Sequence, residues 1–230
     1  MATAQKNKHP SHLGVGLYSQ AEASRLLGIS PATLARWIHP ETRLITRRFA
    51  DDEHTLSFLE LMELHFIDLF RAEGVPLRVI RETAVAASRR FQSDDYPFCV
   101  KRFDTDGRTI FATLIDHERN AEQVEELRHG QRVFEEIVRP FFRKLDYGQG
   151  TQPVRFWPLE ILGRIVLDPE RKFGKPIDFE TGVPTSAIVD ALRAGEGQAP
   201  QDVAAWLDIP LAAVQAALAF EQSLEESVAA

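Results

Sequence analysis

The sequence has little that would hold a protein together covalently or anchor it in a membrane. Cys99 is the only cysteine among 230 residues, so the chain cannot form an internal disulfide or offer several thiolates to a metal. No apolar run approaches the roughly 20 residues that a membrane span needs. Residues 1–14 have no apolar core behind their basic residues, which excludes a secretory signal. We therefore expect a protein of the reducing cytoplasm that does not enter a membrane.

Motifs for catalysis and for cofactor binding are also missing. The seven histidines include no pair at metal-ligand spacing, and the acidic turn at 104–107 lacks the later Glu that a calcium loop requires. There is no Gly-rich phosphate loop and no nucleophile elbow. Cys99 lies in the apolar run PFCV, where we expect it to be buried and unreactive. The sequence therefore predicts no enzymatic activity, no metal and no cofactor.

Basic residues are concentrated at one end of the chain. The formal net charge is −7, yet residues 1–48 hold seven Lys or Arg against two Glu, a net charge of +5. Residues 194–230 hold six Asp or Glu and no Lys or Arg, a net charge of −6. Phosphate groups attract the first segment and repel the second. This asymmetry suggests two different partners, of which only the N-terminal one can be nucleic acid.

The stretch YSQAEASRLLGISPATLARWI has the pattern of a helix-turn-helix. Ser19 and Glu22 form a capping box that begins a first helix, and Gly28 ends it. Ser30 caps a second helix, with a proline at its first position. Three-helix units also serve as packing motifs, but the local positive charge favours DNA binding. The outer face of the second helix would meet base edges in the major groove through Ala32, Thr33 and Arg36.

The next segment is similar to the small β-wing that often accompanies such a motif. Extended runs at 44–49 and 54–56 flank an acidic turn at 50–53. Arginines in and before this segment would hold phosphates: Arg25, Arg43, Arg47 and Arg48. A nearly all-apolar helix follows at 58–73, either as core or as a homodimer interface. A dimer is expected because helix-turn-helix proteins usually bind two half-sites about 34–36 Å apart.

The remainder divides into a middle region and a C-terminal region. Runs at 98–103 and 109–114 suggest a β-hairpin around the turn at 104–107, followed by a long helix at 121–145 and a linker at 147–150. The last segment, QDVAAWLDIPLAAVQAALAFEQSLEE, repeats the buried spacing of the first helix-turn-helix, but without basic residues, so protein contact or dimerisation is its better interpretation. We predict a mainly α fold with small β elements: a winged helix-turn-helix at 1–92, a hairpin and long helix at 93–150, and a small all-helical domain for protein contact at 151–230.

Two parts of the chain resemble known families. The segment with Leu167-Asp168-Pro169, Gly174-Lys175-Pro176 and Gly182-Val183-Pro184, followed by an acidic helical pair, resembles the "domain of unknown function 433" family. Its usual G-T-R is replaced here by Glu180-Thr181-Gly182. The first 90 residues resemble a MerR-type winged helix, through YSQAEASRLLGISPATLARW and FRAEGVPLRVIRE, but lack its usual paired aromatics. The combination is similar to VapB-like antitoxins over roughly residues 16–222.

The resemblance implies an antitoxin of a type II toxin–antitoxin pair, which would inhibit a PIN-like ribonuclease toxin and repress its own operon. PIN nucleases gather carboxylates around metal ions, so a basic residue inserted there would inhibit them. The acidic C-terminal tail cannot supply one, which leaves Arg171, Lys172 and Lys175 as candidates for protein contact. Two alternatives remain. One is a stand-alone MerR-like regulator whose middle and C-terminal parts sense a small ligand, in a pocket lined by the hairpin with Trp157 nearby. The other is a scaffold that never binds DNA.

Overall fold

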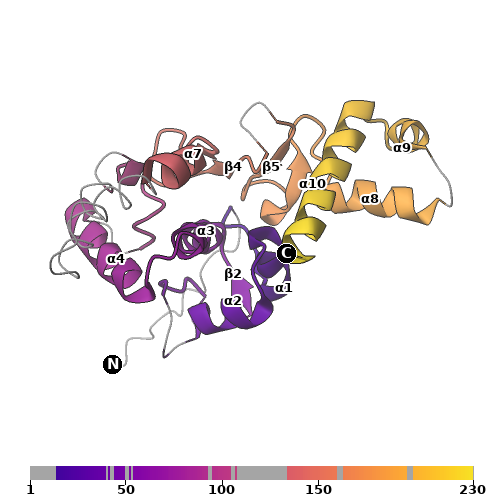
Figure 1. Cartoon of the computed structure of the whole chain (residues 1–230). Helices are drawn as coiled ribbons and strands as arrows, with labels where there is room; N and C mark the ends of the chain where they lie inside the picture. The colour runs from indigo at the N-terminus through magenta and orange to yellow at the C-terminus, as the bar shows by residue number, and fades with distance from the viewer. Residues whose placement is uncertain are drawn as a thin grey trace, which may run out of the picture.

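The computed structural model describes residues 14–39, 41, 44–49, 52, 54–92, 95–104, 107, 134–159, 163–195 and 199–229. In these residues the protein is mainly helical, with one two-stranded and one four-stranded sheet. Figure 1 shows α4 (Leu77–Phe91) at one end of an elongated molecule and α8 (Thr185–Ala194) and α9 (Pro200–Leu207) at the other, with the C-terminus lying beside α1 (Gln20–Leu27) between them. The mainly α fold with small β elements is therefore confirmed at this coarse level.

The two helices predicted at the N-terminus are present as α1 (Gln20–Leu27) and α2 (Pro31–Ile38). The Ser19 hydroxyl accepts the backbone N–H of Glu22 and the Glu22 carboxylate accepts that of Ser19, so the capping box is confirmed. Gly28 ends α1 in the left-handed conformation, with φ of +68°. Ser30 caps α2 through the backbone N–H of Thr33.

The expected wing is not formed as a hairpin. Residues 44–49 are not a strand, and β2 (Thr55–Leu56) pairs instead with β1 (Tyr18–Ser19), antiparallel and directly before α1. The reason lies in α3 (Phe58–Ala72), whose Glu60 accepts the backbone N–H of Arg48 at 3.0 Å and so turns the 44–49 segment toward the helix. The turn at 50–53 lies mostly outside the described residues.

Helix α3 is the centre of the main hydrophobic core. Phe58, Leu61, Leu64 and Phe66 are each at most 1% exposed, and α1, α4 (Leu77–Phe91) and the one-turn π-helix η1 (Phe134–Val138) contact α3. The apolar surface of α3 is therefore covered within one chain. As an interface between two copies, α3 was the wrong candidate, because its own fold buries it.

The middle region differs from its prediction. Residues 97–102 form turns, and Phe103 and Asp104 are helical, so the expected strand at 98–103 is absent. The backbone N–H groups of Phe98 and Cys99 donate to the buried carboxylate of Glu63 on α3, which uses the donors that a strand would need. The run at 109–114 and most of the helix expected at 121–145 lie outside the described residues. From residue 134 that segment continues as η1 and α7 (Arg139–Phe142).

A four-stranded antiparallel sheet follows, in the order β3 (Leu145–Asp146), β4 (Arg155–Phe156), β5 (Ile165–Leu167) and β6 (Pro176–Asp178). The expected linker at 147–150 is the loop between β3 and β4, in which Tyr147 is buried and donates to the carbonyl of Cys99. The expected boundary at residue 150 therefore falls inside one sheet. Because β4 to β6 lie in 151–230, that region is not all-helical.

The C-terminal unit consists of α8 (Thr185–Ala194), α9 (Pro200–Leu207) and α10 (Leu211–Ala229). Its core contains Ile188, Ala204, Ile209, Val214 and Ala217, so the buried spacing predicted from the sequence is confirmed. The connection between α9 and α10 passes through Asp208 in the left-handed conformation, where the first unit has Gly28. The protein thus contains two pairs of helices joined by short turns, α1–α2 and α9–α10.

Candidate nucleic-acid interface

The outer face of α2 is accessible, as a reading helix requires. Ala32 and Arg36 are exposed, and Thr33 is half-buried with its hydroxyl accepting a hydrogen bond from that of Ser30 at 3.0 Å. The opposite face of α2 is anchored in the core through Leu34 and Trp37. The structure therefore brings Ala32, Thr33 and Arg36 together on one side of a rigid helix.

The four arginines expected at phosphates have different surroundings. Arg48 is exposed, whereas the side chain of Arg47 is 5% exposed and pairs with the buried carboxylate of Glu60 at 2.8 Å. Arg47 also donates to the carbonyls of Asp52 and Thr55. These bonds use the guanidinium for structure and leave little of it for phosphate. Arg43 lies outside the described residues.

Arg25 connects the two units. Its guanidinium lies 2.5 Å from the carboxylate of Glu221 on α10, and the other oxygen of that carboxylate accepts a hydrogen bond from Thr185. The side chain of Arg25 is 39% exposed and that of Glu221 is 9% exposed. A phosphate at Arg25 would therefore compete with an intramolecular carboxylate.

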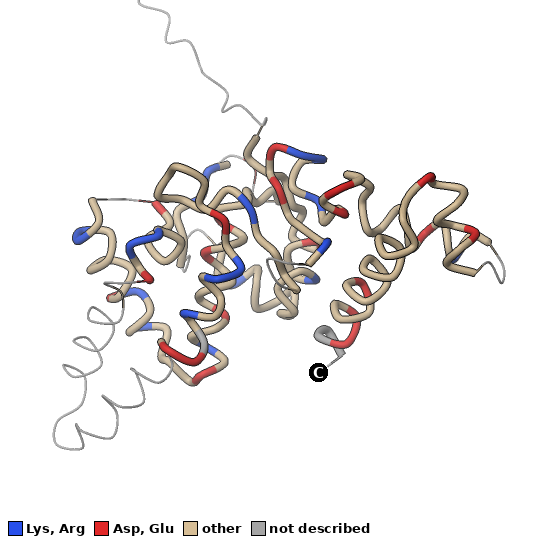
Figure 2. Tube along the Cα trace, turned by 90° about the horizontal axis from the view of Figure 1, so that it is seen from above, with Lys and Arg blue, Asp and Glu red and all other residues tan. Residues whose placement is uncertain are grey.

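A second basic helix was missed in the sequence. In α4 the residues Arg78, Arg81, Arg89 and Arg90 are all exposed, and their spacing at i, i+3, i+11 and i+12 places them within one half of a helix. Arg89 and the 44–46 segment after α2 line a common hollow of about 460 Å³. The signal was present in the sequence as LRVIRETAVAASRRF. In Figure 2 blue segments are spread over the body that contains α1 to α4, while the limb with α8 to α10 carries red ones.

The residues expected at a protein contact lie on and beside the short 3-10 turn η2 (Lys172–Gly174). Lys172 and Lys175 are exposed, and the Lys175 ammonium lies 3.9 Å from Glu22 of α1. Arg171 is half-buried, stacks over the Phe179 ring at 5.3 Å and donates to the carbonyl of that residue. Only the two lysines are therefore readily available to a partner.

The turn η2 is held in an unusual backbone conformation against the N-terminal unit. Lys172, Phe173 and Gly174 all have positive φ, at 49°, 57° and 83°. The carbonyl of Phe173 accepts the N–H of Leu17, and the carbonyl of Gly174 accepts the buried hydroxyl of Tyr18. These bonds offset the strain of the non-glycine residues and present the Phe173 ring to solvent at 53% exposure.

Comparison with known proteins places these units in context. Residues 165–220 match the family described as "Protein of unknown function (DUF433)", which covers β5 to most of α10. The chain is 25% identical over 204 residues to the Mycobacterium tuberculosis protein named "Putative antitoxin VapB45", across 79% of this chain and 84% of that protein. A crystal structure of Rv2018 from Mycobacterium tuberculosis has the same fold, with a TM-score of 0.71 at 24% identity, over 90% of this chain and 99% of that one.

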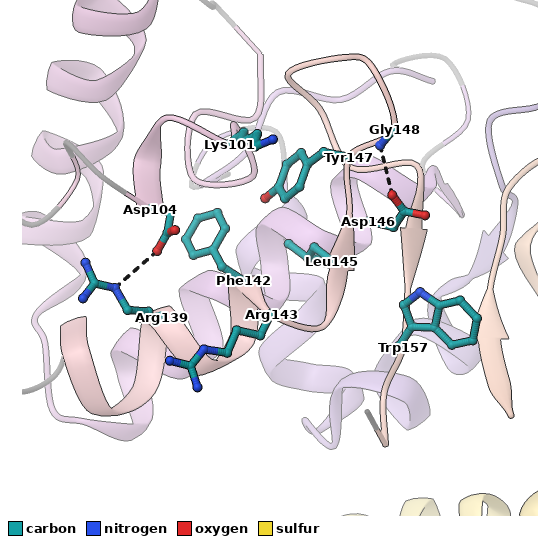
Figure 3. A pocket seen from close by; sticks show the side chains of 10 residues that line it. All are labelled: Lys101, Asp104, Arg139, Phe142, Arg143, Leu145, Asp146, Tyr147, Gly148 and Trp157. Atoms are coloured by element: carbon teal, nitrogen blue, oxygen red, sulfur yellow. Dashed lines mark hydrogen bonds and ion pairs between the residues drawn. The ribbon is translucent and has the colours of Figure 1, made fainter. Parts of the chain in front are cut away.

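A hollow in the middle region has a volume of about 770 Å³. Figure 3 shows its side chains from three places: the 101–104 segment, α7, and the β3–β4 strands with their loop. Arg139 pairs with Asp104 at 3.5 Å, and the exposed side chains of Lys101 and Arg143 add two more cations. Trp157 is one of the lining residues, as the ligand-sensing alternative expected. The lining holds three cations against the carboxylates of Asp104 and Asp146, a net charge of +1.

Buried titratable groups in the core have structural partners. Burial raises the pKa of Glu63 to about 7, against hydrogen bonds from Cys99 and Phe98 that lower it. Burial, with the nearby charge of Lys144, lowers the pKa of His65 to about 4, and its ring lies 4.3 Å from that of Phe141. Burial also raises the pKa of the Cys99 thiol. None of these groups combines the access and activation that catalysis requires.

The described residues contain no group of three His, Cys, Asp or Glu side chains placed to hold a metal ion. No single helix among them is long and apolar enough to cross a membrane, and the pair α9–α10 reaches that length only across a bend of 117°.

Proposed function

We propose that this protein is the DNA-binding antitoxin of a type II toxin–antitoxin pair, which neutralises a PIN-like ribonuclease toxin and represses its own operon in the cytoplasm. The observation that carries the proposal is the similarity to "Putative antitoxin VapB45" across 79% of the chain. The fold shared with Rv2018 at a TM-score of 0.71 is consistent with it. An antitoxin acts by binding, which agrees with the absence of catalytic motifs in the sequence.

Operator binding is assigned to the N-terminal unit. Thr33 and Arg36 on α2 read base edges beside Ala32, while Arg25, Arg43 and Arg48 supply positive charge for phosphates. Arg47 contributes by holding the 44–49 segment to α3. Two copies would bind two half-sites about 34–36 Å apart.

Toxin inhibition through an inserted cation is assigned to Lys172 and Lys175, with Arg171 as a neighbour that the Phe179 ring holds in place. An ammonium entering a metal site lined by carboxylates would neutralise them and displace the metal. Replacing all three residues with Ala should then abolish inhibition while leaving the fold intact. Full inhibition by this triple variant would contradict cation insertion.

The proposal as a whole is tested by co-expression with the product of the neighbouring small open reading frame. We expect that product alone to arrest growth, this chain to restore growth, and the two proteins to co-purify. Lack of toxicity together with lack of a complex would contradict the antitoxin assignment. Operator binding is measured separately on the upstream DNA, where phosphate contacts must give an affinity that falls steeply with salt.

A ligand-responsive transcriptional regulator is the second candidate, favoured by the cationic hollow of about 770 Å³ around Lys101, Arg139 and Arg143. Such a regulator would bind an anionic small molecule there and change its affinity for DNA. The discriminating measurement is operator affinity with and without a panel of small carboxylates and phosphates. An unchanged affinity across the panel would count against this candidate.

A further inference from the structure

The two helix pairs, α1–α2 and α9–α10, correspond residue by residue at a constant offset of 180. The first helices are α1 (Gln20–Leu27) and α9 (Pro200–Leu207), and the second helices begin at Pro31 and Leu211. The turns match as well: the N–H of Ile29 donates to the carbonyl of Ser24 at 3.1 Å, and that of Ile209 to Ala204 at 3.0 Å. Each surface of one unit can therefore be compared with its equivalent in the other.

The outer face of α1 is covered by α10. Leu26 is packed against the cluster that contains Phe220 and Leu224, and α1 contacts α10 directly. Beside this apolar contact, the pair Arg25–Glu221 closes the interface. Figure 1 shows the end of α10 lying beside α1. In the first unit, this face of the first helix is thus a docking site for a second, oppositely charged helix.

The equivalent face of α9 is exposed to solvent, and no helix or strand among the described residues covers it. The counterpart of Leu26 is Trp206, which at 72% is the most exposed large apolar side chain among the described residues. The counterpart of Arg25 is Ala205, so this face carries no cation. The exposed carboxylates of Asp202, four residues before Trp206 on the same helix, and of Asp208 in the turn lie beside it. Asp202 accepts the backbone N–H of Ala199 at 3.1 Å, and neither carboxylate has an ion-pair partner in the part of the chain that the structure describes.

We propose that the α9 face, defined by Asp202, Ala205, Trp206 and Asp208, is the surface that binds the positively charged, RNA-contacting face of the toxin. This inference rests on the proposed function. A ribonuclease must attract a polyanion, so its substrate face carries Lys and Arg. A tryptophan flanked by unpaired carboxylates complements such a face in both respects: the indole supplies an apolar anchor and the carboxylates pair with its cations.

The charge of the α9 face also argues against two other binding partners, DNA and a second copy of this chain. DNA would be repelled, because residues 194–230 hold six acidic residues and no basic one. A second copy would have to offer a helix like α10, whose Glu221 would then face Asp202 and Asp208 as a like charge. The copy's α10 is moreover already occupied by its own α1. A cationic partner has neither difficulty.

The position of the α9 face on the molecule fits a protein that binds both DNA and a toxin. Figure 1 places α9 at the far end from α2, so a toxin on the α9 face would leave the reading face of α2 accessible. The α9 face is also distinct from the turn η2 with Lys172 and Lys175. The two surfaces therefore make separate predictions about which substitutions weaken the complex.

The test measures the affinity of the full-length chain for the purified product of the neighbouring open reading frame. The variants are Trp206→Ala and the pair Asp202→Asn with Asp208→Asn. We expect Trp206→Ala to weaken the complex at least tenfold, as for a central aromatic anchor. The double variant should associate more slowly than the wild type, and its association rate should depend less on salt concentration, because the removed charges no longer attract the partner. The matched control, Glu41→Gln with Glu226→Gln, removes the same charge from exposed positions outside the α9 face and should bind as the wild type does.

Fluorescence gives a second readout that does not depend on variant stability. Trp37 and Trp157 are 3% and 9% exposed, so acrylamide quenching of the free wild-type protein reports mainly Trp206. We expect the toxin to protect this tryptophan from quenching.

A wild-type complex that leaves Trp206 quenchable, with Trp206→Ala binding at full affinity, would overturn the inference while the antitoxin function stands. Absence of any wild-type complex would instead overturn the antitoxin function itself. Loss of a dimer in Trp206→Ala, with toxin affinity unchanged, would overturn the inference in favour of self-association.

Discussion

Gly174 is one point at which the C-terminal region packs closely against the N-terminal unit. A Cβ at this position would lie 2.4 Å from the hydroxyl of Tyr18, and φ is +83°. Because Tyr18 is 2% exposed and donates to the carbonyl of Gly174 itself, the clash cannot be relieved without moving β1.

We therefore predict that Gly174→Ala destabilises the protein by about 3 kcal/mol, combining backbone strain with a clash in the core. The matched control is Gly74→Ala, where φ is +78° but no atom lies within 4 Å of the added Cβ. This control should cost about 1 kcal/mol, from backbone strain alone. Urea unfolding of both variants measures the difference, and equal losses would show that the contact with Tyr18 adjusts freely.

The raised pKa of Glu63 leads us to predict that the stability of the protein depends on pH. Its pKa is raised from 4.5 to about 7 by burial, so the folded state holds a proton that the unfolded state has already released. Stability should then fall as the pH rises from about 4.5 to 7, by about 3 kcal/mol, and change little from this group at higher pH. In Glu63→Gln this part of the slope should disappear, whatever the variant's stability at low pH. Parallel slopes for the two proteins between pH 5 and 7.5 would refute the assignment.

At the scale of single elements, the first helix pair was predictable because its determinants are local. Ser19, Glu22, Gly28 and Ser30 each act within four residues of their partners, and such caps are readable in a sequence. The second unit was predictable for the same reason, from the buried spacing around Ile209. The outer face of α2 follows directly from the helix period.

The elements that sequence reasoning missed are those fixed by distant partners. The strand β2 pairs with β1, 36 residues earlier, and the run at 98–103 is held in turns by a carboxylate 35 residues before it. The sequence predicts that Arg47 contacts phosphate, but its guanidinium pairs with the buried carboxylate of Glu60, which is on α3. Local patterns do not reveal which side chain will accept from a backbone N–H or pair with a guanidinium. The wing was therefore predicted wrongly, and the ion pair of Arg47 with Glu60 was not foreseen.

Arg47, between α2 and β2, and Arg36, on α2, should therefore have different roles. Arg47→Ala should destabilise the protein by about 3–5 kcal/mol, because it leaves the Glu60 carboxylate buried without its partner. Arg36→Ala should leave the unfolding midpoint nearly unchanged and weaken operator binding by about 1–3 kcal/mol. Thermal unfolding and operator titration at fixed salt measure the two effects. A stable Arg47→Ala with weakened DNA binding would return Arg47 to the DNA interface.

On the scale of the whole molecule, the N-terminal and C-terminal units are parts of one folded body. The hydroxyl of Tyr18 reaches Gly174, the guanidinium of Arg25 reaches Glu221, and Leu26 is packed against Phe220. These contacts hold the two units against each other. They also explain why the division of the chain at residue 150 finds no gap in the structure, since the sheet β3–β6 continues through it.

This interlocking predicts a single unfolding transition that depends on α10. Phe220 is 1% exposed, so Phe220→Ala should destabilise the whole protein by about 3–5 kcal/mol. In a Trp206→Phe background, fluorescence reports Trp37 of α2 and Trp157 of the sheet, whereas far-UV circular dichroism reports all helices. Because both probes follow one body, Phe220→Ala should shift the two transitions together. If the C-terminal helices unfolded by themselves, only the dichroism would shift while the fluorescence midpoint stayed in place, and the contact between α1 and α10 could not then carry a signal from a bound toxin to the operator.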